Sequence, residues 1–230
     1  MSAIGCGPVQ VPLLGFARRG RAGTVHLMWP RKSALERCVD AMMERVHQAG
    51  DDHVQLVVVL EEYLRLADVE GAGKEGFFFD IGAWSQTLAD SYLALGRVED
   101  AVRVVTDATR GGHSEGAEML CALGEKLMRC GHEPRARCLW SQARDAFPDD
   151  VWIYVQAGIE YSDLGAHSTA LAWLSPGMEL ALRTGDPECA LEQLVGLRAT
   201  SLAATGDTPD DLQARAQSAL ARMTGDTRGQ

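Results

Sequence analysis

The residues LGEKLMRCGHEPRARCLWSQA, at positions 123–143, contain the pattern that decides the fold. Only glycine enters the left-handed cap conformation without steric cost, so a first helix should end at Gly131. A second helix should begin at Pro134, because the N–H that proline lacks has no partner in a first turn. The small residues Gly124 and Ala136 lie on either side of this turn. The stretch therefore predicts two antiparallel helices whose backbones approach closely at the small residues.

The same pattern recurs before and after this stretch. Placing Gly96, Gly131 and Gly165 in register aligns three windows at spacings of 35 and 34 residues. The windows are 82–116, 117–150 and 151–184. The aligned positions are Ala89, Gly124 and Gly158; Tyr92, Leu127 and Tyr161; Ala101, Ala136 and Ala170; Val105, Trp140 and Leu174; and Ala108, Ala143 and Gly177. The chain thus repeats a small, large, turn, small, large pattern, as helical repeat proteins do.

At these positions the sequence resembles the tetratricopeptide repeat (TPR) family, best over residues 82–184. The motif residues are Leu88, Ala89, Tyr92, Gly96, Ala101, Val105 and Ala108; then Leu123, Gly124, Leu127, Gly131, Ala136, Trp140, Ala143 and Pro148; then Gly158, Tyr161, Gly165 and Ala170. The likeness weakens over 185–224, where Asp211 replaces a small residue. The resemblance implies an all-α fold, an α-solenoid of antiparallel helix hairpins wound as a right-handed superhelix.

Helix-start and helix-end signals predict further hairpins outside the three windows. Residues 33–36 read as a capping box, and Gly-Asp pairs at 50–51, 185–186 and 206–207 read as a helix end followed by the next cap. We expect a disordered N-terminal leader (1–32), an N-terminal helical hairpin (33–68), a linker (69–79), three TPR-like repeats (80–184), a C-terminal divergent repeat or capping hairpin (185–224) and a disordered tail (225–230).

One proline breaks the pattern of the third window. Pro176 lies within the expected second helix, where it removes a hydrogen bond and clashes with the preceding turn. We therefore expect that helix to end near Leu174, with Ser175 capping a short helix that follows.

Composition excludes several classes of function. The net charge is −10, whereas a nucleic-acid binder needs a basic surface to displace counterions from phosphate. The arginines at 18, 19, 21 and 31 lie in a glycine-rich segment without a helix or strand pattern, which favours a disordered leader over a phosphate-binding arm. No apolar run approaches the roughly 18–20 residues that span a bilayer, and the N-terminus lacks the order of a secretory signal. We expect a cytoplasmic protein without a membrane, and the scarcity of lysine and asparagine suggests a GC-rich bacterial genome.

The cysteines and histidine within residues 130–138 raise the question of a metal or redox site. In the register, Cys130 aligns with Leu95 and Leu164, which predicts a small core residue at a helix end. A structural zinc site needs four ligands, and Cys130, His132 and Cys138 are only three. We therefore expect a hairpin turn rather than a metal site, no cofactor, and cysteines that serve as small reduced core residues.

Catalytic motifs are missing from the sequence. The glycines at 71–76 depart from a phosphate-binding loop, because Asp68 stands at the first glycine position and Glu75 follows Lys74. There is no His-Glu-x-x-His, no Gly-x-Ser-x-Gly and no dinucleotide fingerprint. We therefore expect no catalytic residues and no enzymatic activity, with an enzyme on a helical scaffold as a third possibility.

The TPR resemblance implies a concave groove lined by the first helix of each pair. The residues at the corresponding positions are Gln86, Asp90, Leu93, Glu118, Cys121, Glu125, Met128, Arg129, Trp152, Val155, Ile159 and Asp163. The family's clamp for a peptide carboxylate uses lysine and asparagine, and Gln86, Asp90, Glu118 and Glu125 do not fit it. Acidic and apolar side chains instead predict a basic, partly apolar ligand, for which Trp152 is either an anchor or a cover for the neighbouring hairpin.

Two classes of function remain open on these grounds. The first is a non-enzymatic interaction module that binds a peptide or protein segment, of unknown identity, in the acidic groove. The alternative is a regulatory or sensory domain that binds a small ligand or signalling peptide and acts with a separate effector protein. The sequence predicts no oligomeric state.

Overall fold

The computed structural model describes residues 34–70, 80–113, 116–186 and 189–226, and every regular element in that part of the chain is an α-helix. The helices are α1 (Ala34–Ala49), α2 (His53–Glu70), α3 (Ile81–Ala94), α4 (Val98–Arg110), α5 (Glu118–Arg129), α6 (Glu133–Ala146), α7 (Trp152–Asp163), α8 (His167–Thr184), α9 (Leu191–Thr205) and α10 (Asp211–Asp226). Among these helices, none combines the length and the apolar content needed to cross a bilayer. The predicted leader lies outside the described residues. The predicted linker and tail also lie mostly outside the described residues. Only their first two residues are described, as the ends of α2 and α10 respectively.

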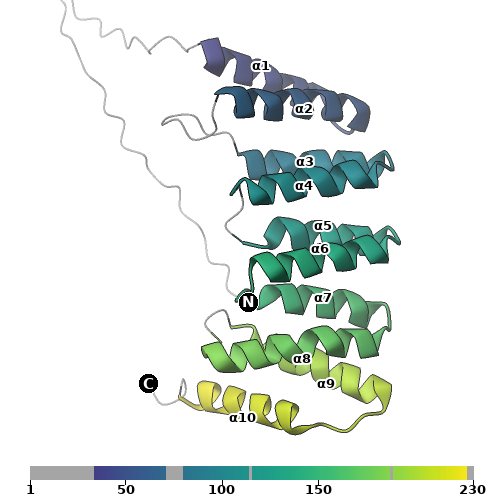
Figure 1. The fold of residues 1–230 in the computed structure, drawn as a ribbon, viewed down its shortest axis with the longest axis vertical. Coiled ribbons are helices and arrows are strands. Elements are labelled where there is room, and N and C mark those ends of the chain that lie inside the picture. The colour runs from purple at the N-terminus through teal and green to yellow at the C-terminus, as the bar shows by residue number, and fades with distance from the viewer. Residues whose placement is uncertain (1–33, 71–79, 114–115, 187–188, 227–230) are drawn as a thin grey trace, which may run out of the picture. The chain divides into compact units, whose positions relative to one another are not determined.

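The chain divides into two compact units, residues 1–41 and residues 42–230, and the boundary between them lies within α1. In the second unit, consecutive helices lie side by side from α2 to α10 (Figure 1). The helices α3, α5, α7 and α9 also contact one another in sequence. Of the even-numbered helices in the described part, only α8 and α10 approach each other in the same way. Helices α3, α5, α7 and α9 therefore form a continuous layer.

The turn at Gly131 has the predicted geometry. Gly131 has a φ of +80°, and the N–H of His132 donates to the carbonyl of Leu127 at 2.8 Å, which satisfies an orphan carbonyl at the helix end. Gly96 and Gly165 have φ values of +72° and +71°. Pro134 is the second residue of α6. The prediction that a first helix ends at Gly131 and a second begins beside Pro134 is confirmed.

Close packing within the helix pairs depends on two glycines. A Cβ atom on Gly124 would lie 2.7 Å from Nε1 of Trp140, and one on Gly158 would lie 2.3 Å from Cδ2 of Leu174. Trp140 and Leu174 are both fully buried. Each large side chain of a second helix thus lies directly against a glycine of the first helix.

The aromatic ring of Trp140 also links neighbouring pairs. It meets Tyr161 of α7 edge-on with ring centroids 5.8 Å apart, and Trp173 of α8 at 6.3 Å. Such edge-to-face pairs add to the stabilisation from area burial alone. The glycine that admits the indole in α5 therefore also determines how the next pair of helices packs.

The predicted helix break at Pro176 is wrong. The helix α8 continues from His167 to Thr184 with Pro176 inside it. Pro176 and Ala172, whose carbonyl loses its donor, both lie on the exposed side of the helix. Trp173, Leu174 and Met178 are buried on both sides of the proline. Burial of such side chains contributes about 1.5–3 kcal/mol each, enough to offset the roughly 3 kcal/mol cost of the proline.

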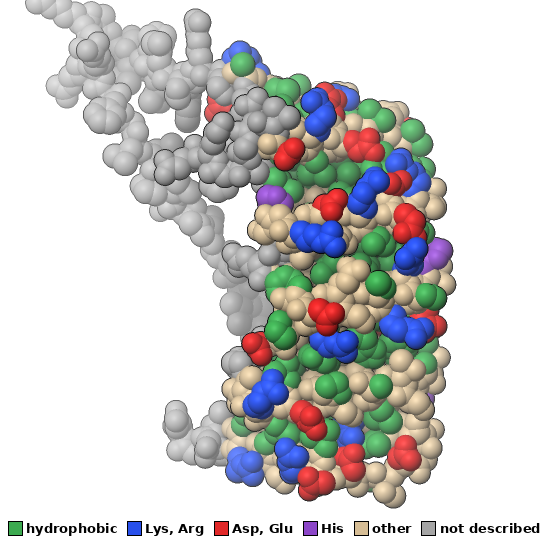
Figure 2. Space-filling view, viewed as in Figure 1, with side chains coloured by type: hydrophobic (Ala, Val, Ile, Leu, Met, Phe, Trp, Pro, Cys, Tyr) green, Lys and Arg blue, Asp and Glu red, His purple; other side chains and the backbone are tan. Residues whose placement is uncertain are grey.

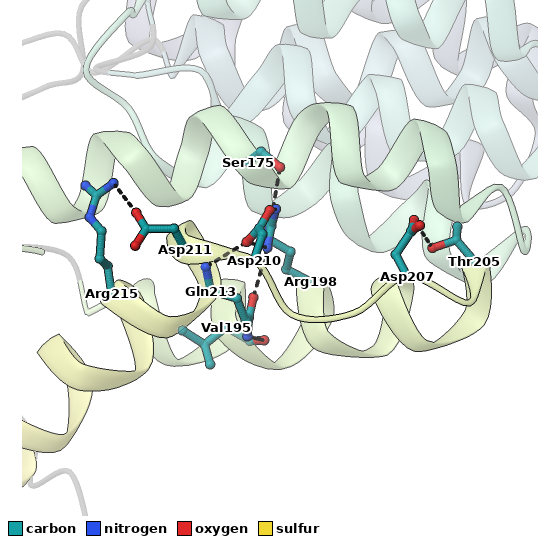
Figure 3. Close-up of polar contacts among 9 residues, drawn as sticks. All are labelled: Ser175, Val195, Arg198, Thr205, Asp207, Asp210, Asp211, Gln213 and Arg215. Carbon is teal, nitrogen blue, oxygen red and sulfur yellow. Dashed lines mark hydrogen bonds and ion pairs between the residues drawn. The ribbon is translucent and has the colours of Figure 1, made fainter.

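A buried arginine joins the last three helices (Figure 3). Arg198 of α9, whose side chain is 5% exposed, donates through Nη1 and Nη2 to Asp210 at 2.9 and 2.5 Å and through Nε to Ser175 of α8 at 3.1 Å. Gln213 of α10 accepts a further bond from Nη1 at 3.3 Å and donates to the carbonyl of Val195. The hydrogen bonds that Asp210 accepts from Arg198, and to a lesser extent from the backbone N–H of Gln213, lower the pKa of its carboxyl to about 2. Ser175 therefore bonds Arg198 rather than capping a new helix.

Substituting Gly124 with alanine tests the close approach of α5 and α6. Overpacking against the rigid Trp140 ring should cost about 1–3 kcal/mol, against a gain of up to about 1 kcal/mol in helix propensity. Gly196→Ala is the matched control, since that helical glycine has no atom within 4 Å of an added Cβ and should gain stability. Urea denaturation measures both free energies of unfolding. Equal gains in the two variants would show that α5 and α6 have room for the methyl group.

Candidate ligand-binding face

The predicted groove residues divide into an accessible set and a buried set. Those accessible to solvent, together called the odd-helix face, are Gln86, Asp90, Leu93, Glu118, Glu125, Arg129, Trp152, Ile159 and Asp163. The buried ones are Cys121, Met128 and Val155, with exposures of 8%, 5% and 0%. Their side chains belong to the core in this structure and do not offer a contact surface.

On one face of the described chain, charge alone does not mark a site. On the face of the described chain that Figure 2 shows, acidic and basic side chains are interspersed among apolar ones, without one large charged patch. The contacts between successive odd-numbered helices are more informative. At each of these junctions two polar side chains from different helices lie close together, and the chemical identity of the two differs from one junction to the next.

At the junction of α3 and α5, an internal ion pair neutralises the predicted acidic residue. Lys126 Nζ donates to Asp90 Oδ1 at 2.5 Å, and both side chains are about 40% exposed. Lys126 was missed by the sequence analysis, which assigned only Arg129 as a basic residue of the groove. The register contained the signal, since Asp90 lies six residues before Gly96 and Lys126 five before Gly131.

At the junction of α5 and α7, the corresponding positions hold two carboxylates. They are Glu125, six residues before Gly131, and Glu160, five before Gly165. Glu125 Oε1 accepts a bond from Arg129 Nη2 at 2.6 Å within α5. Glu160 is only 7% exposed, and no described residue forms a hydrogen bond or ion pair with it. The junction thus contains a buried acid without a partner, which the sequence analysis also missed.

The surroundings of Glu160 disfavour its charged form. Burial raises the pKa of its carboxyl, Glu125 and Asp163 raise it further, and Arg129 opposes them. The junction of α7 and α9 is different, because there the hydroxyls of Ser162 and Ser201 lie 3.2 Å apart. Of these three junctions, the one between α5 and α7 therefore has the excess of negative charge.

Helix α7 presents an apolar group in line with this acid. Trp152, Gln156, Glu160 and Asp163 are spaced four, four and three residues apart, which places them on one side of the helix. Trp152 is 38% exposed. It lies about 12 Å from Glu160 along the helix axis, at 1.5 Å per residue. The exposed indole of Trp152 and the unpaired carboxylate of Glu160 thus lie on the same side of α7, in a row of residues called the α7 stripe.

The structure corrects the reading of the cysteines. Cys130, His132 and Cys138 are exposed, as are the aligned Leu95 and Leu164 at 39% and 60%, so Cys130 is a surface residue rather than part of the core. Among the described residues, no three histidine, cysteine or acidic side chains form a group that could hold a metal ion.

Most of the other cysteines were also assigned wrongly to the core. Cys38 and Cys189 are exposed, and of the described cysteines only Cys121 is buried. Burial raises the pKa of the Cys121 thiol to about 12, with Asp150 and Glu118 adding to the effect.

A separate hollow lies between α2, α3 and α4. It is a cleft of about 700 Å³ with Glu61, Asp68, Asp107 and Arg103 on its walls, and with apolar side chains such as Leu64 and Leu88. Its residues come from three helices, which is why no sequence motif indicated it.

A tyrosine of the cleft holds one of these carboxylates. Tyr92 Oη donates to Glu61 Oε1 at 2.5 Å, and Arg97 lies over the Tyr92 ring with its guanidinium carbon 4.4 Å from the centroid. Burial and the Glu61 contact raise the pKa of Tyr92 to about 12, so Tyr92 remains a hydrogen-bond donor at neutral pH.

Glu160→Gln should raise the melting temperature at neutral pH. Because the pKa of Glu160 is raised in the folded state, folded protein binds the proton more readily than unfolded protein, and stability falls as pH rises through that pKa. Glutamine lacks this dependence, so its advantage should disappear in acid. Calorimetry across pH measures it, with the exposed Glu179→Gln as control. A lower melting temperature for Glu160→Gln at neutral pH would mean that the carboxylate has a partner.

Comparisons with protein-family models, with curated proteins and with solved structures find no match. Function therefore has to be inferred from the chemistry of the odd-helix face and of the cleft.

Proposed function

We propose that this protein is a non-enzymatic interaction module whose odd-helix face binds a basic, partly apolar segment of a peptide or protein. We further propose that its helix pairs form a TPR-like right-handed solenoid, with the odd-helix face on the concave side. The proposal draws support from the three aligned glycine turns and from the continuous layer of α3, α5, α7 and α9. The five described cysteines are free and four are exposed, which fits a reducing cytoplasm.

Unbalanced charge on the odd-helix face is the reason to expect a basic ligand. The charged residues of the odd-helix face, together with Lys126 and Glu160 at its helix junctions, are five acids and two bases. The acids are Asp90, Glu118, Glu125, Glu160 and Asp163, and the bases are Lys126 and Arg129. The two bases pair with Asp90 and Glu125. The other three acids have no ion pair with a described residue. Glu160 is the observation that carries the proposal, because a largely desolvated carboxylate without a cationic partner is costly.

Apolar groups on the same face suit a ligand that is not purely ionic. Trp152 is 38% exposed, and Leu93 and Ile159 are partly exposed. An accessible indole is typical of the aromatic anchors that dominate binding energy at protein interfaces. Polar groups nearby would then fix the orientation and register of the bound segment.

The cleft between α2, α3 and α4 favours a second candidate function. Its volume of about 700 Å³ and its mixed apolar and acidic lining would suit a small cationic molecule with an apolar body. In that case the protein would be a regulatory domain that responds to the small molecule and acts through a separate effector. A ligand that binds only the folded state raises its melting temperature. Stabilisation by alkylamines that Asp107→Asn removes would favour the cleft over the odd-helix face.

A labelled basic and apolar peptide tests the main proposal. It should bind more tightly than an acidic peptide of the same apolar content, and its affinity should fall with added salt, as expected for exposed charges. The double variant Glu118→Gln with Asp163→Asn should weaken binding by about threefold to tenfold. Asp145→Asn with Glu179→Gln, on α6 and α8, is the control with the same change of charge. Fluorescence anisotropy measures the affinity of both peptides for the wild type and for the two double variants. Equal effects of the two double variants would place the binding surface elsewhere.

A further inference from the structure

We propose that the junction of α5 and α7 is a subsite for a single lysine or arginine side chain of the bound segment, with Glu160 as its recognition group. This inference rests on the proposed function and specifies which part of the ligand the face selects. It follows from a comparison of two junctions within the chain, from the pairing of Arg129, and from the position of Trp152 on α7.

The junction of α3 and α5 shows what completes such a site. There the carboxylate of Asp90 receives the ammonium group of Lys126 at 2.5 Å, across two helices. At the junction of α5 and α7, Glu125 takes the place of Asp90, and Glu160 takes the place of Lys126. The charge at the second position is therefore reversed. An ammonium or guanidinium group from outside the chain would supply the cation that Lys126 supplies at the first junction.

The chain's own arginine does not fill this role. The guanidinium of Arg129 is bound to Glu125 at 2.6 Å on α5 and makes no ion pair with Glu160. Glu160 also gains no hydrogen bond from the part of α9 that the structure describes, since Ser201 faces Ser162. Glu160 is only 7% exposed as a residue, while its carboxylate oxygens keep some access to solvent, so an incoming cation can reach them. A charge-assisted bond in such a partly desolvated place is stronger than one in open solvent. Arg129 acts as a competitor, because it already neutralises half of the carboxylate pair.

The α7 stripe fixes the spacing of the ligand. Trp152 lies about 12 Å from Glu160 along the helix, and an extended peptide advances about 3.3 Å per residue. The basic residue of the ligand should therefore stand about three or four positions from a large apolar residue. This spacing separates a specific subsite from general attraction to an acidic surface, which does not depend on the order of residues.

A double-mutant cycle with two matched peptides tests the subsite. The probe is labelled Gly-Leu-Phe-Ser-Ser-Gly-Lys-Leu-Gly, and its partner carries norleucine, an uncharged side chain of similar shape, in place of lysine. With wild-type protein, we expect the change from lysine to norleucine to weaken binding about tenfold, as for a charge-assisted bond. With Glu160→Gln the same change should have almost no effect. With Arg129→Gln, which removes the competitor, the lysine peptide should bind more tightly than to wild type.

Controls separate this inference from the proposed function. Glu118→Gln changes the net charge by the same amount as Glu160→Gln but should leave most of the preference for lysine intact. Circular dichroism establishes that each variant is folded. If the wild type binds the lysine peptide and Glu160→Gln retains the full preference, the subsite is wrong while the interaction module stands. If the wild type binds none of the basic peptides, both proposals are overturned.

Discussion

The contact between a glycine of one helix and a large side chain of its partner governs the arrangement of this protein. Trp140 lies against Gly124 and Leu174 lies against Gly158, with no room for even a methyl group on either glycine. Because the two helices of a pair meet through these contacts, the side chains on their other sides are free to contact the next pair or the solvent. Some side chains pack against the next pair of helices, and the ring of Trp140 itself also contacts Tyr161 and Trp173 there. Others are left on the odd-helix face.

Tight packing also explains how an acid comes to be buried without a partner. Glu160 lies at the junction of two helices whose separation is set by the core beneath them, so the backbone cannot move away to expose it. A carboxylate in that position reduces the stability of the folded protein at neutral pH. Groups that reduce stability in this way are concentrated at functional sites, where a ligand compensates for them. That reasoning, rather than the total charge of the face, connects the fold to a function.

Local rules predicted the helices well and the site poorly. Gly131 and Pro134 act within their own turn, so the sequence indicated both helix ends correctly. Pro176 obeys the same local rule, but the burial of Trp173 and Met178 outweighs it, and burial depends on distant residues. Lys126 and Glu160 were missed because their significance depends on what lies across a junction, and the cleft was missed because three helices form it.

The buried arginine of α9 has a consequence for how the end of the chain unfolds. In a row of helices that mainly contact their neighbours, the terminal helix is ordinarily the first to fray. Here Arg198 depends on Asp210 and Gln213, so detachment of α10 would leave a guanidinium group buried without its carboxylate. The two helices should therefore open as one cooperative unit. Their backbone amides should then exchange with a common free energy of opening, rather than with one that falls progressively toward the C-terminus.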